Sequence, residues 1–187
     1  KFLTPERLSD PWAVEALTNE LHMAAALHHP GIVQILGHDH LSLQDLHSWH
    51  PHFRPSTPYL VMEWIEGGSL RPHCGKLAWP ELYSILSQLL DALAASHARG
   101  VIHRDLKPAN MLLRKSNLLQ SPTVLLTDFG ISQALNAAAG VECEVAGTPA
   151  YMAPEQLIGH LSEQGPWTDL FALGCTAWAL ACGQPPF

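Results

Sequence analysis

The hydrophobic positions along the first third of the chain predict one helix followed by two strands. The Asp-Pro pair at 10–11 has the form of an N-cap with proline at the first helical position, and apolar residues at helical spacing follow to about Leu27. The His-Pro-Gly segment at 29–31 ends this helix. The segments at 32–36 and 59–64 are rich in β-branched and aromatic residues and predict strands.

Between these strands, residues 38–58 are polar and contain prolines, so we expect an inserted loop. Its histidines are His38, His40, His47, His50 and His52. A metal site is one interpretation of this cluster, but the histidines lack a partner cysteine set and a paired spacing on a helix. A solvated surface loop is therefore the favoured interpretation.

The remainder of the chain alternates between helical and extended patterns. A helix beginning at Trp79 carries one apolar stripe, made of Leu82, Ile85, Leu86, Leu89 and Leu93. Two short extended segments, 111–113 and 124–126, are separated by a polar turn. The segment 169–181 is nearly all apolar and predicts a helix that is buried on all sides.

Composition and charge place the chain among soluble globular proteins. Of its 187 residues, 47% are hydrophobic and 14% are charged, enough for a hydrophobic core. The net charge of −7 argues against a nucleic-acid partner, which requires a basic surface. No segment has the unbroken apolar length of about 20 residues that a membrane span needs.

The cysteines and the first residue bear on the setting of the chain. The four cysteines show no C-x-x-C spacing, which favours a reducing, cytoplasmic location. The chain begins at Lys1 with neither an initiator methionine nor a signal peptide, so we expect it to be truncated. The sequence does not indicate an oligomeric state.

The segment His-Arg-Asp-Leu-Lys-Pro-Ala-Asn at 103–110 places three chemically useful side chains in one loop. Asp105 can accept a proton from a substrate hydroxyl, and Lys107 can neutralise charge on a moving phosphoryl group. The side-chain oxygen of Asn110 can hold Mg²⁺. Each residue alone would be an ordinary loop residue, whereas the set has the composition of a phosphoryl-transfer site.

Three motifs in order resemble those of the eukaryotic-type serine/threonine protein kinases. They are the 103–110 segment, the Asp-Phe-Gly at 128–130, and the Gly-Thr-Pro-Ala-Tyr-Met-Ala-Pro-Glu segment at 147–155. The amino-acid sequences of the first and third motifs are similar to those of the bacterial branch of this family. The resemblance covers essentially the whole chain, although the glycine-rich loop and the last helices of the family are absent.

The resemblance implies a role for each residue of these motifs. Asp105 resembles the catalytic base, Lys107 the charge-neutralising residue of serine/threonine kinases, and Asn110 a metal ligand. Asp128 resembles the residue that holds the Mg²⁺ bridging the ATP phosphates, against an ordinary turn aspartate as the alternative. The implied cofactors are ATP and Mg²⁺.

The resemblance also implies a nucleotide site. Lys1 and Glu20 resemble the lysine–glutamate pair that orients the α- and β-phosphates, although Lys1 could instead be an exposed terminal lysine. The remaining implied contacts of the adenosine are the gatekeeper Met62, the hinge residues Glu63 and Ile65, the ribose contact Ser69 and the floor residue Leu112.

Three further residues resemble the parts of the family that support the substrate and the loop. Thr148 resembles the residue that favours serine or threonine acceptors. Glu155 normally pairs with an arginine in a later helix, which is absent here, so we expect it to be unpaired in this chain. Asp169 resembles the anchor that accepts hydrogen bonds from the backbone of the catalytic loop.

The segment between Asp128 and Thr148 has no hydroxyl at positions 133–147. In the family, the arginine corresponding to Arg104 commonly binds a phosphorylated residue there. Our hypothesis is that Glu142 or Glu144 replaces that phosphate and makes the kinase constitutively active. The alternative is a flexible loop, with Arg104 in contact with solvent.

These observations together predict an α+β, two-lobed, protein-kinase-like fold that is incomplete at both ends. Residues 1–64 would form a small antiparallel β lobe with one helix, and 65–187 a mainly helical large lobe. The expected function is ATP-dependent phosphorylation of serine or threonine on protein substrates. The alternatives are a pseudokinase scaffold, disfavoured by the complete motif set, and a small-molecule kinase, disfavoured by the 147–155 segment.

Overall fold

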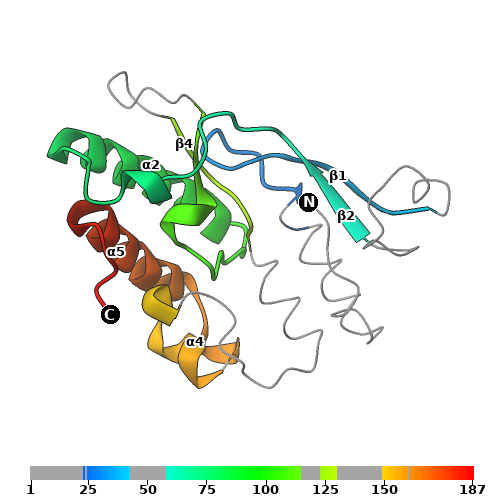
Figure 1. Cartoon of the computed structure of the whole chain (residues 1–187). Helices are drawn as coiled ribbons and strands as arrows, with labels where there is room; N and C mark the ends of the chain where they lie inside the picture. Colours follow the sequence, from blue (N-terminus) through cyan, green and yellow to red (C-terminus); the bar gives the residue numbers. More distant parts are fainter. Residues whose placement is uncertain (1–22, 24, 43–57, 115–122, 130–148, 160) are drawn as a thin grey trace.

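A computed structural model describes residues 23, 25–42, 58–114, 123–129, 149–159 and 161–187. The predicted helix at 10–27 therefore lies almost wholly outside the described residues, as do Lys1, Glu20, Thr148 and the two glutamates at 142 and 144. Figure 1 shows a strand pair on one side of the molecule and a body of helices on the other.

Strands β1 (Ile35–His40) and β2 (Pro58–Met62) form an antiparallel pair with a bulge between Ile35 and Gly37. The predicted first strand at 32–36 was wrong in its bounds. Residues 31–33 instead pair with the strand β4 described below, through Val33 N–H to Leu126 O at 2.8 Å and Leu126 N–H to Gly31 O at 2.8 Å. The apolar start of the segment is used for this buried contact, and β1 begins only after it.

The predicted loop at 38–58 was consequently too long at its start. His38 and His40 lie on β1, where they pair with Leu60 and Pro58 of β2. Both histidines are exposed, and an exposed edge strand accepts polar side chains. The other three histidines of the segment lie outside the described residues, and among the described residues no cluster of His, Cys, Asp or Glu is placed to hold a metal ion.

Helix α2 (Trp79–His97) forms because its N-terminus is capped and its apolar face is buried. Glu81 accepts a hydrogen bond from the Ala78 N–H at 2.7 Å, which satisfies one of the free amides of the first turn. The buried face contains Leu82, Ile85, Leu89, Ala92, Leu93 and Ser96. This face agrees with the predicted stripe except at Leu86, which is only partly buried.

Two strands follow α2, with the bounds that the sequence predicted. Strands β3 (Met111–Leu113) and β4 (Val124–Leu126) are antiparallel, and Met111 is opposite Leu126. Both strands are almost fully buried, and β4 packs against α2. The hairpin therefore lies in the centre of the core, where it can position the residues at its ends.

Besides α2, the described residues form short helices, which lie both before and after the hairpin, and one long helix. These are the 3₁₀ turns η3 (Arg71–His73), η4 (Pro108–Asn110), η5 (Pro149–Tyr151) and η6 (Leu161–Glu163), with helices α4 (Pro154–Ile158) and α5 (Pro166–Cys182). Helix α5 packs against α2, as Figure 1 shows. Among the described residues, no helix combines the length and apolarity needed to cross a bilayer.

The prediction that the apolar helix at 169–181 is buried on all sides was wrong. Leu173, Ala179 and Leu180 lie in the core, whereas Leu170 is 51% and Trp178 53% exposed. Among the described residues, one face of α5 meets α2, η4 and η5, because an apolar sequence does not itself supply partners for every face.

Candidate active site

The β3–β4 hairpin brings two of the predicted site residues together. Asn110 directly precedes β3 and Asp128 lies two residues after β4, so the antiparallel pairing places both at the same end. The backbone confirms this register, since the Thr127 N–H donates to Asn110 O at 3.0 Å. The two side chains with hard oxygen ligands therefore come from adjacent backbone positions.

The carboxylate of Asp105 is held by the other polar residues of its loop. Lys107 Nζ lies 2.8 Å from Oδ1 and 2.9 Å from Oδ2 of Asp105. Asn110 Nδ2 donates to the same carboxylate at 2.9 Å and to the Asp105 carbonyl at 2.8 Å. Because the amide nitrogen of Asn110 faces Asp105, its side-chain oxygen is directed elsewhere and can serve as a cation ligand.

The backbone just before Asp105 is held by Asp169, from the first turn of α5. The side chain of Asp169 is fully buried, and its Oδ2 and Oδ1 accept hydrogen bonds at 2.8 Å from the N–H groups of His103 and Arg104. His97, in the last turn of α2, lies with Nε2 2.7 Å from Oδ2. Asp169 thus contacts the backbone of the 103–110 loop, as the sequence predicts, and His97 is an additional partner.

His103 links the loop to the residues after β4. Its Nε2 lies 3.0 Å from Thr127 O, its Nδ1 accepts from the Asp105 N–H at 3.3 Å, and its ring lies 4.5 Å from that of Phe129. Burial lowers the pKa of His103, while the charges of Asp169 and Asp105 act in the opposite direction. A neutral imidazole protonated on Nε2 fits both hydrogen bonds.

Two residues of the site have unusual backbone conformations. Arg104 has φ 64° and Asp128 has φ 67°, in the left-handed region that side chains other than glycine rarely adopt. Such conformations cost about 1–3 kcal/mol each and persist only where surrounding contacts impose them. The hydrogen bonds that Asp169 accepts from the His103 and Arg104 N–H groups, and the contact of His103 Nε2 with Thr127 O, supply such contacts.

Helix α4 contributes a contact that the sequence analysis did not identify. Gln156 Nε2 donates to Arg104 O at 2.8 Å, and its Oε1 accepts from the Ala153 N–H at 3.1 Å. Gln156 is buried and connects the 149–158 segment to the 103–110 loop. Gln156 directly follows the Pro-Glu pair of the third motif, and this position is the sequence signal that could have identified it.

Glu155, which was expected to lack its arginine partner, accepts a hydrogen bond from a neutral side chain of α5. Thr168 Oγ1 donates to Glu155 Oε1 at 2.6 Å and itself accepts from the Gly165 N–H at 3.1 Å. A hydroxyl group can donate and accept at once, so Thr168 satisfies both the carboxylate and the start of α5.

The predicted adenosine contacts lie around a small apolar cluster. Met62 and Leu112 pack against Val33, Ile65 and Leu125, and Ser69 forms an isolated bridge with Leu112. The structure thus brings together four of the five predicted residues, from β2, β3 and the segment between them.

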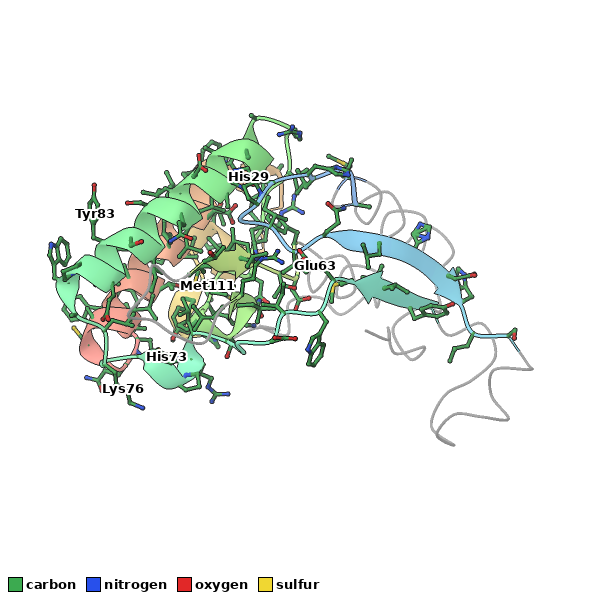
Figure 2. All side chains as sticks on the ribbon, turned by 90° about the horizontal axis from the view of Figure 1, so that it is seen from above. His29, Glu63, His73, Lys76, Tyr83 and Met111 are labelled. Carbon is green, nitrogen blue, oxygen red and sulfur yellow. The ribbon has the colours of Figure 1, made fainter. Side chains whose placement is uncertain are left out.

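Glu63, the fifth of these residues, joins the strand pair to the hairpin. Its Oε1 accepts from the Gln34 N–H at 2.9 Å, and its Oε2 lies 2.9 Å from Arg114 Nη2. Figure 2 shows Glu63 where the β1–β2 pair meets the rest of the molecule. The side chain of Glu63 is thus occupied by protein contacts. Any contact of Glu63 with the predicted adenine base would therefore come from its backbone.

The family model of the protein kinase domain matches residues 1–187 of this chain. The chain therefore belongs to the protein kinase family. The bacterial serine/threonine kinase resemblance is confirmed by its relatives. The chain is 41% identical over 162 residues to serine/threonine-protein kinase Pkn1 of Myxococcus xanthus, covering 83% of the chain and 22% of that protein. It is 36% identical over 193 residues to serine/threonine-protein kinase PknA of Mycobacterium tuberculosis, covering 100% of the chain and 41% of that protein.

Solved structures confirm the predicted fold class. The kinase domain of Mycobacterium tuberculosis PknI superimposes with a TM-score of 0.73 at 26% identity, covering 100% of this chain and 64% of that one. The chain thus has the protein-kinase fold, and it spans less than half the length of the two curated relatives above.

Proposed function

We propose that this chain contains the catalytic centre for ATP-dependent phosphorylation of serine or threonine residues on protein substrates. The observation that carries the proposal is the Asp105 carboxylate held by Lys107 and Asn110, at the hairpin end that also carries Asp128. A base, a cation and two metal-ligand candidates in one place are what phosphoryl transfer requires.

In the proposed reaction, Asp105 accepts the proton of the substrate hydroxyl while the hydroxyl oxygen forms a bond to the γ-phosphorus of ATP. The bond from that phosphorus to the bridging oxygen breaks, and ADP leaves with the electron pair. Lys107 Nζ, beside the carboxylate, neutralises charge on the transferred phosphoryl oxygens. His103 and Asp169 act on the backbone and hold the loop in this geometry.

The donors at the hairpin end fit Mg²⁺. Asn110 and Asp128 offer hard oxygen ligands, and Mg²⁺ typically takes one or two such protein ligands and completes its octahedron with phosphate and water oxygens. When bound, the ion supplies positive charge to the phosphate oxygens. We assign Asn110 and Asp128 to this role.

We propose that the nucleotide binds between a small lobe ending near Trp64 and a large lobe beginning at Ile65. Met62, Ile65 and Leu112 would contact the base, the backbone at Glu63 and Ile65 would form its hydrogen bonds, and Ser69 would reach the ribose. Lys1 and Glu20 are proposed to orient the phosphates, and Thr148 to favour the hydroxyl acceptor. Because the reaction consumes ATP, we place it in the cytoplasm.

The test is transfer of labelled γ-phosphate from ATP to a protein acceptor by the complete protein. Asp105→Asn should lower kcat by about 100-fold or more, the usual contribution of a positioned general base. Asp91→Asn, the same change at a side chain that is 76% exposed on α2, should leave kcat unchanged. Equal transfer by the Asp105→Asn variant and the unmodified protein would overturn the assignment of the base, and absence of transfer by the unmodified protein would favour a scaffold.

A further inference from the structure

A groove of about 510 Å³ lies beside the catalytic loop. Its walls come from η3, η4, η5 and the end of α5, and they include Arg71, Cys74, Lys107, Ala109, Tyr151 and Pro185. The Gly75 N–H donates to Leu180 O at 2.8 Å, which fixes η3 against α5. Figure 2 shows His73 and Lys76 at this end of the molecule.

The groove adjoins the proposed reaction centre. Lys107 lines the groove, and its Nζ contacts both oxygens of Asp105 at 2.8 and 2.9 Å. An extended peptide advances about 3.3 Å per residue. Because Lys107 both contacts Asp105 and lines the groove, a peptide with its hydroxyl at Asp105 would carry side chains a few residues from the acceptor into the groove.

The charge of the groove is positive. Arg71 and Lys107 line it, and no Asp or Glu is among its described lining residues. The positive charge of Lys107 is balanced by Asp105, whereas Arg71 has no ion-pair partner among the residues that the structure describes. Arg71 is exposed and can therefore reach a ligand.

The directions in which the pKa values of Cys74 and Tyr151 are shifted agree with this charge distribution. Burial raises the pKa of the Cys74 thiol and of the Tyr151 hydroxyl. The positive charge of Arg71 acts against both increases, and that of Lys76 acts against the increase at Cys74. Arg71 therefore acts electrostatically on both Cys74 and Tyr151.

We propose that this groove selects protein substrates with an acidic side chain two or three residues from the phosphorylated serine or threonine. Arg71 is the specificity-determining residue, because a guanidinium group binds a carboxylate through two parallel hydrogen bonds. The proposal rests on the kinase activity proposed above and names the substrate class of that same site.

The experiment measures kcat/KM of the complete protein with a set of peptides. Each peptide has one serine in a neutral background and carries glutamate, alanine or lysine at a single position, from four residues before the serine to four residues after it. The unmodified protein should prefer glutamate over lysine by about 3- to 10-fold at a position two or three residues away, as expected for a partly solvated ion pair.

Substitution of Arg71 tests the assignment to the groove. Arg71→Glu should reverse the preference at that position, and Arg71→Ala should abolish it, which keeps the test available if either variant is unstable. Arg99→Glu is the matched control, since Arg99 is also exposed but lies after α2 and donates to Ala95 O at 2.9 Å. It should retain the preference of the unmodified protein.

The outcomes separate the inference from the proposed function. Phosphorylation of all peptides without a glutamate preference would overturn the groove's selectivity and leave the kinase activity standing. A preference lost equally in the Arg71 and Arg99 variants would show an effect of overall charge and would also overturn the assignment. Failure to phosphorylate any peptide or protein would overturn both proposals.

Discussion

At the scale of single residues, the site depends on side chains that bond to backbone groups. Asp169 accepts from the N–H groups of His103 and Arg104, and Gln156 donates to the carbonyl of Arg104. His103 reaches the carbonyl of Thr127. Because each bond spans many residues of sequence, the conformation of the loop is set by the folded core rather than by the loop itself.

Protonation of His103 should destabilise the fold. Its pKa is lowered from 6.5 by burial, so the unfolded chain binds the proton more readily than the folded chain does. The free energy of unfolding should therefore fall as the pH drops below about 6.5 and recover above it. Urea unfolding at pH 7.5 and 5.5 measures this difference, which His103→Phe should reduce.

The same change at an exposed histidine provides the control for this measurement. His28→Phe should leave the difference between the two pH values as it is in the unmodified protein, because His28 is exposed. An unchanged difference in the His103→Phe variant would assign the pH dependence to other groups.

At the scale of elements, Asp169 joins two helices and the catalytic loop. It lies in the first turn of α5, where a negative charge is favourable, and contacts His97 in the last turn of α2. Its two oxygens also hold the backbone at His103 and Arg104. The packing of α2 against α5 is thus coupled to the position of Asp105.

Asp169→Asn should therefore reduce both stability and turnover. An amide has one oxygen, so its NH₂ group would face a backbone N–H that loses its acceptor. The expected loss is about 2–4 kcal/mol in the free energy of unfolding, measured with urea, and a fall in kcat larger than the change in KM. Asp91→Asn, at an exposed position of α2, should change the free energy of unfolding by less than about 0.5 kcal/mol. Similar losses in both variants would contradict the anchoring role.

At the scale of the whole molecule, the strand pair and the helical body meet at a few specific contacts. Ile32 bridges Leu126 of the hairpin, and Glu63 contacts both the Gln34 backbone and Arg114. The apolar cluster at Val33 lies at the same junction. A nucleotide bound there would touch both parts and would stabilise their association.

Addition of ATP and Mg²⁺ should accordingly raise the melting temperature of the complete protein. A ligand at 100 times its Kd adds about 2.7 kcal/mol to the free energy of unfolding. Chelation of the metal should remove much of the shift, and Asp128→Asn should make the remaining shift insensitive to Mg²⁺. Differential scanning fluorimetry measures these changes.

An exposed aspartate on β1 serves as the control for Asp128. Asp39→Asn should retain the full shift and its dependence on Mg²⁺, since Asp39 is exposed and accepts from the neighbouring His40 N–H at 2.7 Å. An Asp128→Asn variant that responds to Mg²⁺ as the unmodified protein does would argue against Asp128 as a ligand.

The sequence by itself determined the elements whose signals are local. The short extended segments at 111–113 and 124–126 were predicted with their final bounds, because each is an apolar segment next to a polar turn. The stripe on α2 and the motif residues Asp105, Asn110 and Asp128 were also readable, since spacing and residue type identify them. The protein-kinase fold class followed from the resemblance of these ordered motifs to a known family, and the family model confirms it.

Only the tertiary structure decided which residues support that site and which faces are buried. His97 and Asp169 are 72 positions apart, and Gln156 and Arg104 are 52 apart, so no local pattern predicts either contact. Pairing with distant strands likewise decides that the start of the 31–40 segment lies beside β4 and the rest beside β2. The exposed face of α5 also depends on which segments pack against the helix. Local sequence sets the periodicity of an element, whereas burial and long-range hydrogen bonds arise only when distant segments pack together.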